Sequence, residues 1–134
     1  MTKTLQQSTF KNLSRKLLSG EFVQASDLLA KAHNQGYDLP TMLDTNQQSL
    51  LHFAMQALKS HYQTKKWTPQ CIDIITDLYT KYGLEDNLDK AGLSPFMYAV
   101  DVTLSRSEYE KIIPHTNLSL CNRKLKNLLF CFVD

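Results

Sequence analysis

Three segments of the chain align without gaps, and this repeat constrains the fold more than any other feature. They are DTNQQSLLHFAM at 44–55, DKAGLSPFMYAV at 89–100 and NRKLKNLLFCFV at 122–133. Each segment opens with Asp or Asn, and five residues later it reaches Ser49, Ser94 or Asn127, which can cap a helix. A unit of this size cannot bury its apolar face alone, so neighbouring copies must stack to build a continuous core.

A second amphipathic helix follows each of these helix starts. Apolar residues recur at helical spacing over Phe22–Ala32 and again over Ile72–Tyr82. Thr68-Pro69 can begin the second of these helices and Gly83 can end it, and a capping box with a Pro stop marks a further helix over 105–114. No stretch alternates apolar and polar residues as a strand does, so the sequence predicts an all-α fold of helix pairs joined by short polar turns.

The composition is that of one folded domain. Of the 134 residues, 43% are apolar and 21% are charged, which is neither a disordered nor a fibrous composition. A net charge of +2 is too small for a dedicated binder of nucleic acid or of a membrane surface. The longest wholly apolar run, 128–133, is far shorter than the roughly 20 residues that span a bilayer. We therefore expect a single domain over 1–134 with neither a nucleic-acid nor a membrane partner.

The three cysteines, Cys71, Cys121 and Cys131, are an odd number in a chain that is long enough to build a core without disulfides. The first ten residues are polar and lack the apolar core of a signal peptide. We expect a cytoplasmic protein whose cysteines are reduced core thiols. The ligand spacing of a zinc site is absent from the sequence, so no metal is expected.

The residues at 89–99 resemble the ankyrin repeat, whose motif Asp-x-x-Gly-x-Thr-Pro-Leu-His-x-Ala recurs about every 33 residues. One copy matches at Asp89, Gly92, Ser94, Pro95, Phe96 and Ala99. Another matches at Asp44, Ser49, Leu51, His52 and Ala54, with Gln47 where the family has Gly and Leu50 where it has Pro. The resemblance implies an ankyrin-like solenoid of stacked helix-turn-helix repeats, in which His52 bonds within the turn and the start of the helix.

The resemblance divides the chain into repeats of unequal length. They cover approximately 11–43, 44–88, 89–121 and a partial copy at 122–134, with Lys11–Leu18 as a degenerate first helix. Two of the distances between equivalent helix starts are longer than the 33-residue period. They predict one insertion in the turn at 36–44 and another at 58–70, between the helices of the second repeat. A bundle of unrelated helix pairs is the structural alternative, because apolar helix faces alone do not separate the two architectures.

In the ankyrin family, partner contacts come from the turn residues and from the solvent side of the first helix. The resemblance therefore implies a module that captures a protein partner without turnover. The positions carried over from the family as partner contacts are Thr45, Asn46, Gln48, Gln56, Lys90, Ala91, Leu93, Asp101, Arg123, Lys124 and Lys126. Leu43, Ala57, Leu88, Val102 and Cys121 belong to the same set of positions, and for Leu88 we favour burial in the core.

The insertion at 58–70 brings aromatic and basic residues together. The residues are His61, Tyr62, Lys65, Lys66 and Trp67, and aromatic and basic side chains can anchor protein interfaces. The alternative, which we favour slightly, is that the aromatic rings cover the helix ends while the lysines stay in solvent.

Catalytic patterns are few. The four histidines are scattered, and no Gly-rich phosphate loop, HExxH or GxSxG motif occurs. Cys121 and His115 could form a nucleophilic dyad, but a buried thiol is the commoner state of such a cysteine. We expect no enzymatic activity and no cofactor. The alternatives are a scaffold or regulatory piece of a larger assembly, such as a microbial effector that acts on a protein in the host cytosol, and a small enzyme with an unrecognised site.

The last segment has more apolar residues than one short helix can bury against one neighbour. Phe132 stands in the slot that Ala54 and Ala99 occupy in the other copies, where we expect the small alanines to pack between helix pairs. The sequence thus predicts an apolar strip near the end of the chain, which a weak homodimer through Phe130 and Phe132 would cover.

Overall fold

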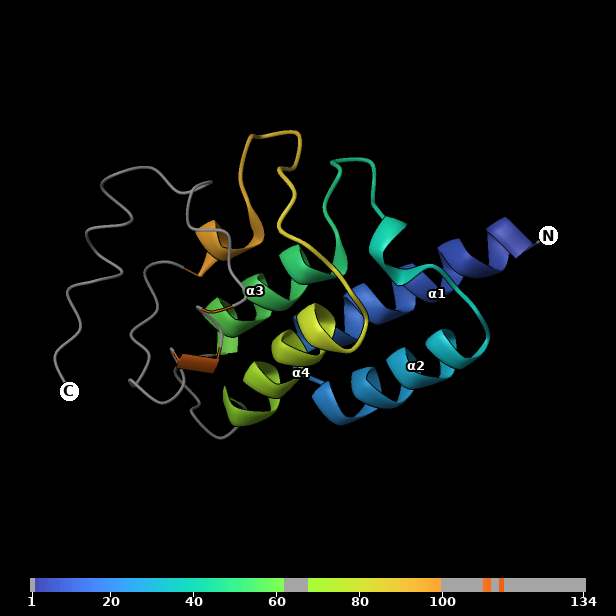
Figure 1. Ribbon diagram of the computed structural model, residues 1–134, viewed down its shortest axis with the longest axis horizontal. Coiled ribbons are helices and arrows are strands. Elements are labelled where there is room, and N and C mark those ends of the chain that lie inside the picture. The colour runs from blue at the N-terminus through green and yellow to red at the C-terminus, as the bar shows by residue number, and fades with distance from the viewer. Residues whose placement is uncertain (1, 62–67, 100–109, 112–113, 115–134) are drawn as a thin grey trace, which may run out of the picture.

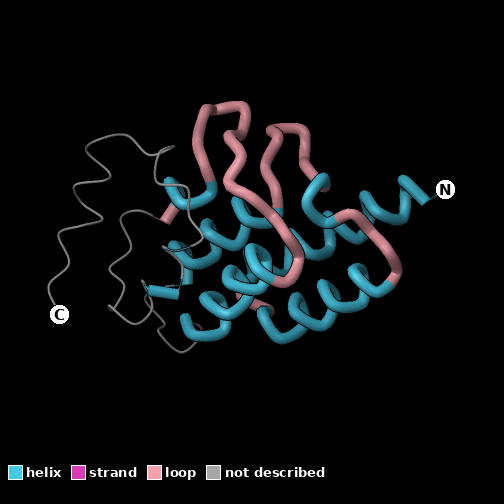
Figure 2. Tube along the Cα trace, in the orientation of Figure 1, coloured by secondary structure: helices cyan, strands magenta, loops and turns pink. Residues whose placement is uncertain are grey.

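The computed structural model describes residues 2–61, 68–99, 110–111 and 114, and its regular elements in these ranges are all helical (Figure 1, Figure 2). The elements are α1 (Thr2–Ser19), α2 (Phe22–Asn34), the 3-10 helix η1 (Leu39–Thr41), α3 (Leu50–His61), α4 (Thr68–Thr80) and the 3-10 helix η3 (Pro95–Tyr98). The all-α class predicted from the sequence is therefore confirmed for this part of the chain.

The four α-helices form two layers. We call α1 and α3 the first helices and α2 and α4 the second helices. α1 lies beside α3 and α2 beside α4, while α1 packs on α2 and α3 packs on α4 (Figure 1). The connections after α2 and after α4 rise as two neighbouring loops on the same side of the molecule, and η3 packs against α3 where the second loop ends (Figure 2).

Gly20 makes the tight connection between α1 and α2. Its φ of +85° lies in the left-handed region, which a glycine adopts without steric cost. Its N–H donates to the carbonyl of Leu17 at 3.2 Å, and the N–H of Glu21 donates to the carbonyl of Lys16 at 2.9 Å. These two bonds satisfy carbonyls at the end of α1 and turn the chain at once into α2.

α1 begins well before the position predicted from the sequence. The expected first helix covered Lys11–Leu18, whereas the helix begins at Thr2. No Gly or Pro interrupts residues 2–19, so nothing in the backbone ends the helix before Gly20. Phe10 adds a tertiary contact, because it is buried and its ring packs edge-on against Phe53 of α3 at 6.0 Å between centroids.

The expected insertion at 58–70 is also shorter than predicted. α3 continues through His61 and α4 begins at Thr68, so both ends of the expected loop are helical. Leu58 explains the extension of α3, because it is buried in the core and a loop there would expose it. Part of the added length in this repeat therefore lengthens its helices.

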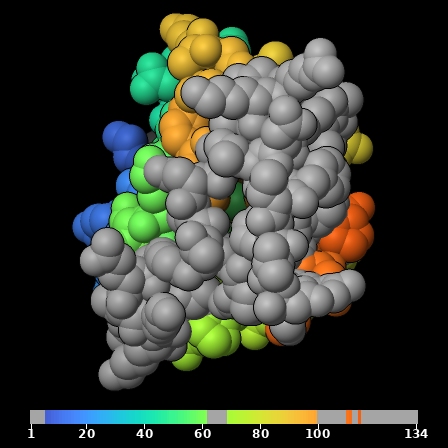
Figure 3. All heavy atoms as spheres, turned by 90° about the vertical axis from the view of Figure 1, so that its left-hand side faces the viewer, coloured from blue at the N-terminus to red at the C-terminus, as the bar shows by residue number. Residues whose placement is uncertain are grey.

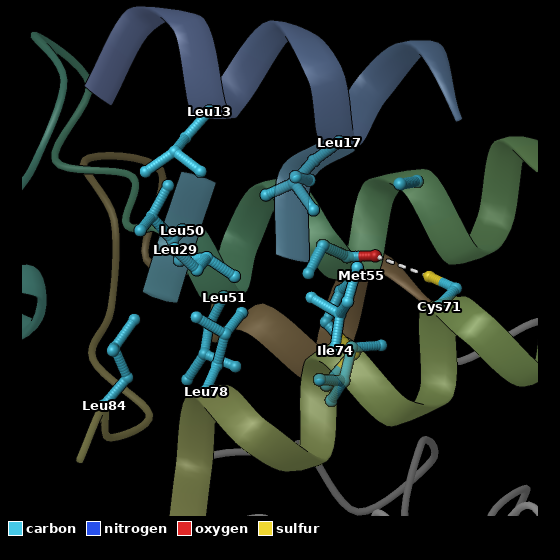
Figure 4. Packing of buried hydrophobic residues seen from close by; sticks show 14 of the residues in the cluster. Leu13, Leu17, Leu29, Leu50, Leu51, Met55, Cys71, Ile74, Leu78 and Leu84 are labelled. Atoms are coloured by element: carbon cyan, nitrogen blue, oxygen red, sulfur yellow. Dashed lines mark hydrogen bonds between the residues drawn. The ribbon is translucent and has the colours of Figure 1, made fainter. Parts of the chain in front are cut away.

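The core lies among the four α-helices. Leu13 and Leu17 of α1 face Leu50, Leu51 and Met55 of α3, and Ile74 and Leu78 of α4 lie on the other side of α3 (Figure 4). Ala54 and Ala99 are both buried, as the repeated small residue led us to expect. Ala54 also contacts α4, because the thiol of Cys71 donates to its carbonyl at 3.6 Å (Figure 4).

The predicted helix start at Ser94-Pro95 is a 3-10 helix over the residues that are described. The expected helix at 105–114, the partial copy at 122–134 and the thiols of Cys121 and Cys131 lie outside the described residues. Among the described helices, none combines the length and the apolar character that crossing a membrane requires.

Candidate protein-binding surface

The turn between η1 and α3 is closed around the carboxylate of Asp44. Its Oδ1 accepts the backbone N–H of Asn46 at 2.8 Å and that of Gln48 at 2.9 Å. The backbone N–H of Asp44 donates to the carbonyl of Gln48 at 3.1 Å, and the N–H of Gln47 donates to the carbonyl of Asp44 at 3.0 Å. A short side chain that mimics a backbone turn explains why Asp stands at this position.

The turn before η3 repeats these bonds around Asp89. Its Oδ1 accepts the N–H of Ala91 at 2.9 Å and that of Leu93 at 3.0 Å. The N–H of Asp89 donates to the carbonyl of Leu93 at 3.0 Å, and the N–H of Gly92 donates to the carbonyl of Asp89 at 2.9 Å. The two turns therefore have the same backbone structure, as the alignment of 44–55 with 89–100 predicts.

In each turn, the third residue after the aspartate has a positive φ. Gly92 has a φ of +78°, and Gln47 at the equivalent position has a φ of +60°. An L-residue with a Cβ pays a steric cost in this region, which glycine does not. Gln47 thus accepts the backbone geometry of a glycine position, so the departure from the family motif there leaves the turn intact.

His52 joins the two turns from inside. The backbone N–H of Ser49 donates to His52 Nδ1 at 3.0 Å, and the Ser49 hydroxyl lies 3.1 Å from the same atom. Because Nδ1 accepts, the ring proton is on Nε2, which donates to the carbonyl of Leu93 at 3.0 Å. The backbone supplies a second link, since the N–H of Lys90 donates to the carbonyl of Asn46 at 2.9 Å.

A side-chain network covers this junction. Gln48 Nε2 donates to Asp89 Oδ2 at 3.1 Å and to the hydroxyl of Tyr98 at 2.9 Å, and Gln56 Nε2 donates to Gln48 Oε1 at 3.2 Å. The Tyr98 hydroxyl donates in turn to Asp89 Oδ2. Asp89 is only 6% exposed, so its carboxylate depends on these donors in place of water.

The network sets the protonation states of its members. Burial raises the pKa of the Asp89 carboxyl, but hydrogen bonds from Tyr98, Leu93, Gln48 and Ala91 more than offset this, and the pKa falls to about 2. Burial, together with the hydrogen bond to Asp89 and its charge, raises the pKa of the Tyr98 hydroxyl to about 12. Asp89 is therefore charged and Tyr98 neutral at physiological pH.

The predicted contact residues divide into two groups. Thr45, Asn46, Lys90 and Ala91 are exposed at the tips of the turns. Gln48, Gln56 and Leu93 are only partly exposed, and the two glutamines are members of the network that joins the turns.

Two of the other positions are corrected by the structure. Ala57 is fully buried in the core and has no surface to offer a partner. Leu88, for which burial was favoured, is 46% exposed, and Leu43 at the equivalent position of the other turn is 48% exposed. The reason is that Asp89 points inward to bond its own turn, which leaves the preceding side chain outside.

Several predicted positions lie outside the described residues. They are Asp101, Val102, Cys121, Arg123, Lys124 and Lys126, the insertion residues Tyr62, Lys65, Lys66 and Trp67, and the strip residues Phe130 and Phe132.

Tyr98 was not among the residues singled out from the sequence. Its partners Gln48 and Asp89 are 50 and 9 residues away along the chain, so no local pattern indicated the contact. His61 was considered only as part of the insertion. Its Nε2 donates to the carbonyl of Leu18 at 2.8 Å and its ring packs edge-on against Phe22, beside a shallow hollow lined by residues 19–24.

The described residues contain no group of three His, Cys, Asp or Glu side chains that could hold a metal ion. Cys71 is a free, buried thiol, and burial raises its pKa to about 12, so it is a poor nucleophile. What the geometry does provide is a pair of rigidly joined turns with exposed tips, on the same side as the first helices. Figure 3 shows the turns at the top, α1 (blue) and the end of α3 (green) below them on one side, and α4 (yellow-green) at the bottom.

Comparison of the chain with protein-family models, with curated proteins and with solved structures finds no significant match.

Proposed function

We propose that this chain is a protein-binding module of the ankyrin-repeat type. It binds its partner through the turn–helix surface, which we define as the two turns 43–49 and 88–94 together with the solvent side of α1 and α3. The observation that supports the proposal most is the pair of turns with identical hydrogen bonds around Asp44 and Asp89, stacked through His52.

This observation favours a repeat solenoid over a bundle of unrelated helix pairs. Unrelated pairs have no reason to share an aspartate that accepts two amides and a positive φ three residues later. They also have no reason to place each first helix beside the next first helix and each second helix beside the next second helix, as α1 to α4 are placed. Stacked copies of one unit require both features.

The exposed residues of the turn–helix surface suit protein binding. Leu43 and Leu88 are two of the large apolar side chains that the described structure leaves exposed, and they occupy the same position in successive turns. Rigid turns bind with little loss of conformational entropy, because their backbone is already ordered. Apolar side chains beside a polar rim are typical of protein interfaces. We place the module in the cytosol, where a free thiol such as that of Cys71 stays reduced.

Affinity capture tests this function. The purified chain is immobilised, and retained proteins are identified by mass spectrometry for the wild type, for Leu43→Ser/Leu88→Ser and for Val23→Ser. Val23 is 59% exposed on α2, outside the turn–helix surface, so it is a matched control for the loss of an exposed apolar side chain. We expect the double variant to lose the partner and Val23→Ser to keep it, with unchanged circular dichroism in both. Equal retention by all three chains would place the binding surface elsewhere.

A further inference from the structure

We infer that the turn–helix surface binds an acidic segment of its protein partner, one in which Asp or Glu side chains accompany apolar ones. The inference rests on the proposed function and adds the charge of the partner. It starts from an uneven distribution of charge between the two layers of helices. The first helix α1 carries four Lys or Arg residues and no Asp or Glu, and α3 carries Lys59 and no acidic residue.

The second helices have the opposite character. α2 contains Asp27 and Lys31, which cancel, and α4 contains Asp73 and Asp77 without a Lys or Arg. The small net charge of the whole chain therefore conceals a basic layer and an acidic layer. A field that is positive on one face attracts acidic groups to that face even when the total charge is near zero.

The cations of α1 can be placed on the turn–helix surface by the contacts of their neighbours. Lys16 Nζ donates to Gln24 Oε1 at 2.7 Å, so this flank of α1 faces α2. Lys11 and Arg15 are exposed and lie one helical turn apart, about 100° to 140° around the helix from Lys16. Phe10 marks the side that faces α3. Lys11 and Arg15 therefore point away from the second helices, toward the open side of the first helices.

The turns add an exposed cation, whereas Asp89 is buried and Asp44 is half-buried. Lys90 is exposed at the tip of the second turn. The two aspartates of the turns each give Oδ1 to two backbone amides, and Asp89 gives its other oxygen to Gln48 and Tyr98. Hydrogen bonds of this kind favour the charged form of a carboxylate. Because both aspartates are turned toward the amides of their own turns, Lys11, Arg15 and Lys90 are more exposed to a partner than either of them.

The exposed leucines of the turns favour an acidic protein segment over a nucleic acid as the negatively charged partner. Leu43 and Leu88 are exposed on the same turns and offer nothing to a phosphate backbone, whereas the apolar side chains of a peptide can cover them. Nucleic-acid sites also use more phosphate contacts than these three cations provide.

The probe for the test is a fluorescein-labelled synthetic peptide in which Glu and Leu alternate with Ser spacers, beside a matched peptide with Gln in place of Glu. Fluorescence anisotropy measures binding at low and at moderate salt. We compare the wild type with Lys11→Glu/Arg15→Glu and with Lys31→Glu/Lys81→Glu, which makes the same change in total charge at exposed positions outside the surface. Circular dichroism confirms that each variant is folded.

We expect the Glu peptide to bind more tightly than the Gln peptide and to weaken as salt is added. Reversing Lys11 and Arg15 should weaken it about tenfold, and reversing Lys31 and Lys81 should change it less than about twofold. Equal binding of the Glu and Gln peptides, or equal losses in the two charge variants, would overturn the inference. So would a single-stranded oligonucleotide that binds the wild type more tightly than the Glu peptide does.

The two experiments together distinguish a failure of this inference from a failure of the proposed function. If Leu43→Ser/Leu88→Ser loses the captured partner while Lys11→Glu/Arg15→Glu keeps it, the surface binds protein but the partner is not acidic, and only this inference fails. If the leucine variant keeps the partner while Lys11→Glu/Arg15→Glu loses the preference for the Glu peptide, the acidic specificity stands and the role of the turns fails.

Discussion

Replacing Gln47 by Gly should stabilise the protein, although the substitution removes a whole side chain. Gln47 has a φ of +60° and is exposed, and among the described residues its side chain has no hydrogen-bond partner. The left-handed conformation costs an L-residue about 1 to 2 kcal/mol. A glycine avoids that cost but gains about 0.5 to 1 kcal/mol of unfolded-state entropy, so the net stabilisation is about 0.5 to 1 kcal/mol.

The matched control is Gly92→Ala at the same position of the next turn. Gly92 has a φ of +78°, and a Cβ built there meets no atom within 4 Å, so the substitution tests backbone conformation without a clash. The alanine has the steric cost of a positive φ, which is offset in part by its smaller loss of conformational entropy on folding. We therefore expect Gly92→Ala to lower the free energy of unfolding by about 0.5 to 1 kcal/mol.

Urea denaturation followed by circular dichroism measures both variants. A change of this size shifts the melting temperature by roughly 2 to 5 °C, which thermal scans resolve. The reasoning is refuted if Gln47→Gly lowers the denaturation midpoint at an unchanged slope, or if Gly92→Ala raises it. Either result would mean that the two turns do not share the backbone structure described above.

Three further predictions concern the junction between the turns and the core. The pKa of Asp89 is lowered to about 2 from 3.8, so its contribution to stability is present above about pH 4 and is lost as the pH falls toward 2. Acid titration followed by fluorescence should show a smaller loss of stability in this pH window for Tyr98→Phe than for the wild type. An equal loss would contradict the role of the Tyr98 hydroxyl. Ala99 is buried, and Ala99→Leu should lower the free energy of unfolding by about 1 to 3 kcal/mol through overpacking, whereas an unchanged urea midpoint would count against its place in the core. The hydroxyl of Ser49 contacts His52, while that of Ser94, equally buried, has no hydrogen-bond partner among the described residues. Ser49→Ala should therefore lower the free energy of unfolding by about 1 kcal/mol, and Ser94→Ala should leave it nearly unchanged. Equal losses in urea denaturation would show that the two hydroxyls are equivalent.

The helical fold and the positions of the turns were predictable because they depend on residues that are close in sequence. Apolar residues at helical spacing indicated α2 and α4, and the aligned segments located both turns and the start of α3. The five-residue spacing from Asp44 to Ser49, which recurs from Asp89 to Ser94, also led to the correct place for the start of α3. The lengths of the helices were harder to predict from the sequence, because the early start of α1 and the extension of α3 depend on burial of Phe10 and Leu58 against other helices.

The sequence by itself determined the all-helical class of the described chain, the two aspartate-centred turns and the exposure of their tips, since each follows from bonds that span at most a few residues. Only the tertiary structure decided what the surface consists of. Gln48, which we expect to contact a partner, is also held by Asp89 and Tyr98, which are 41 and 50 residues away along the chain. Leu88 was expected in the core, but the inward-facing Asp89 keeps it in solvent. Gln48 is held by partners from the second turn and η3, and no stretch of local sequence contains that information.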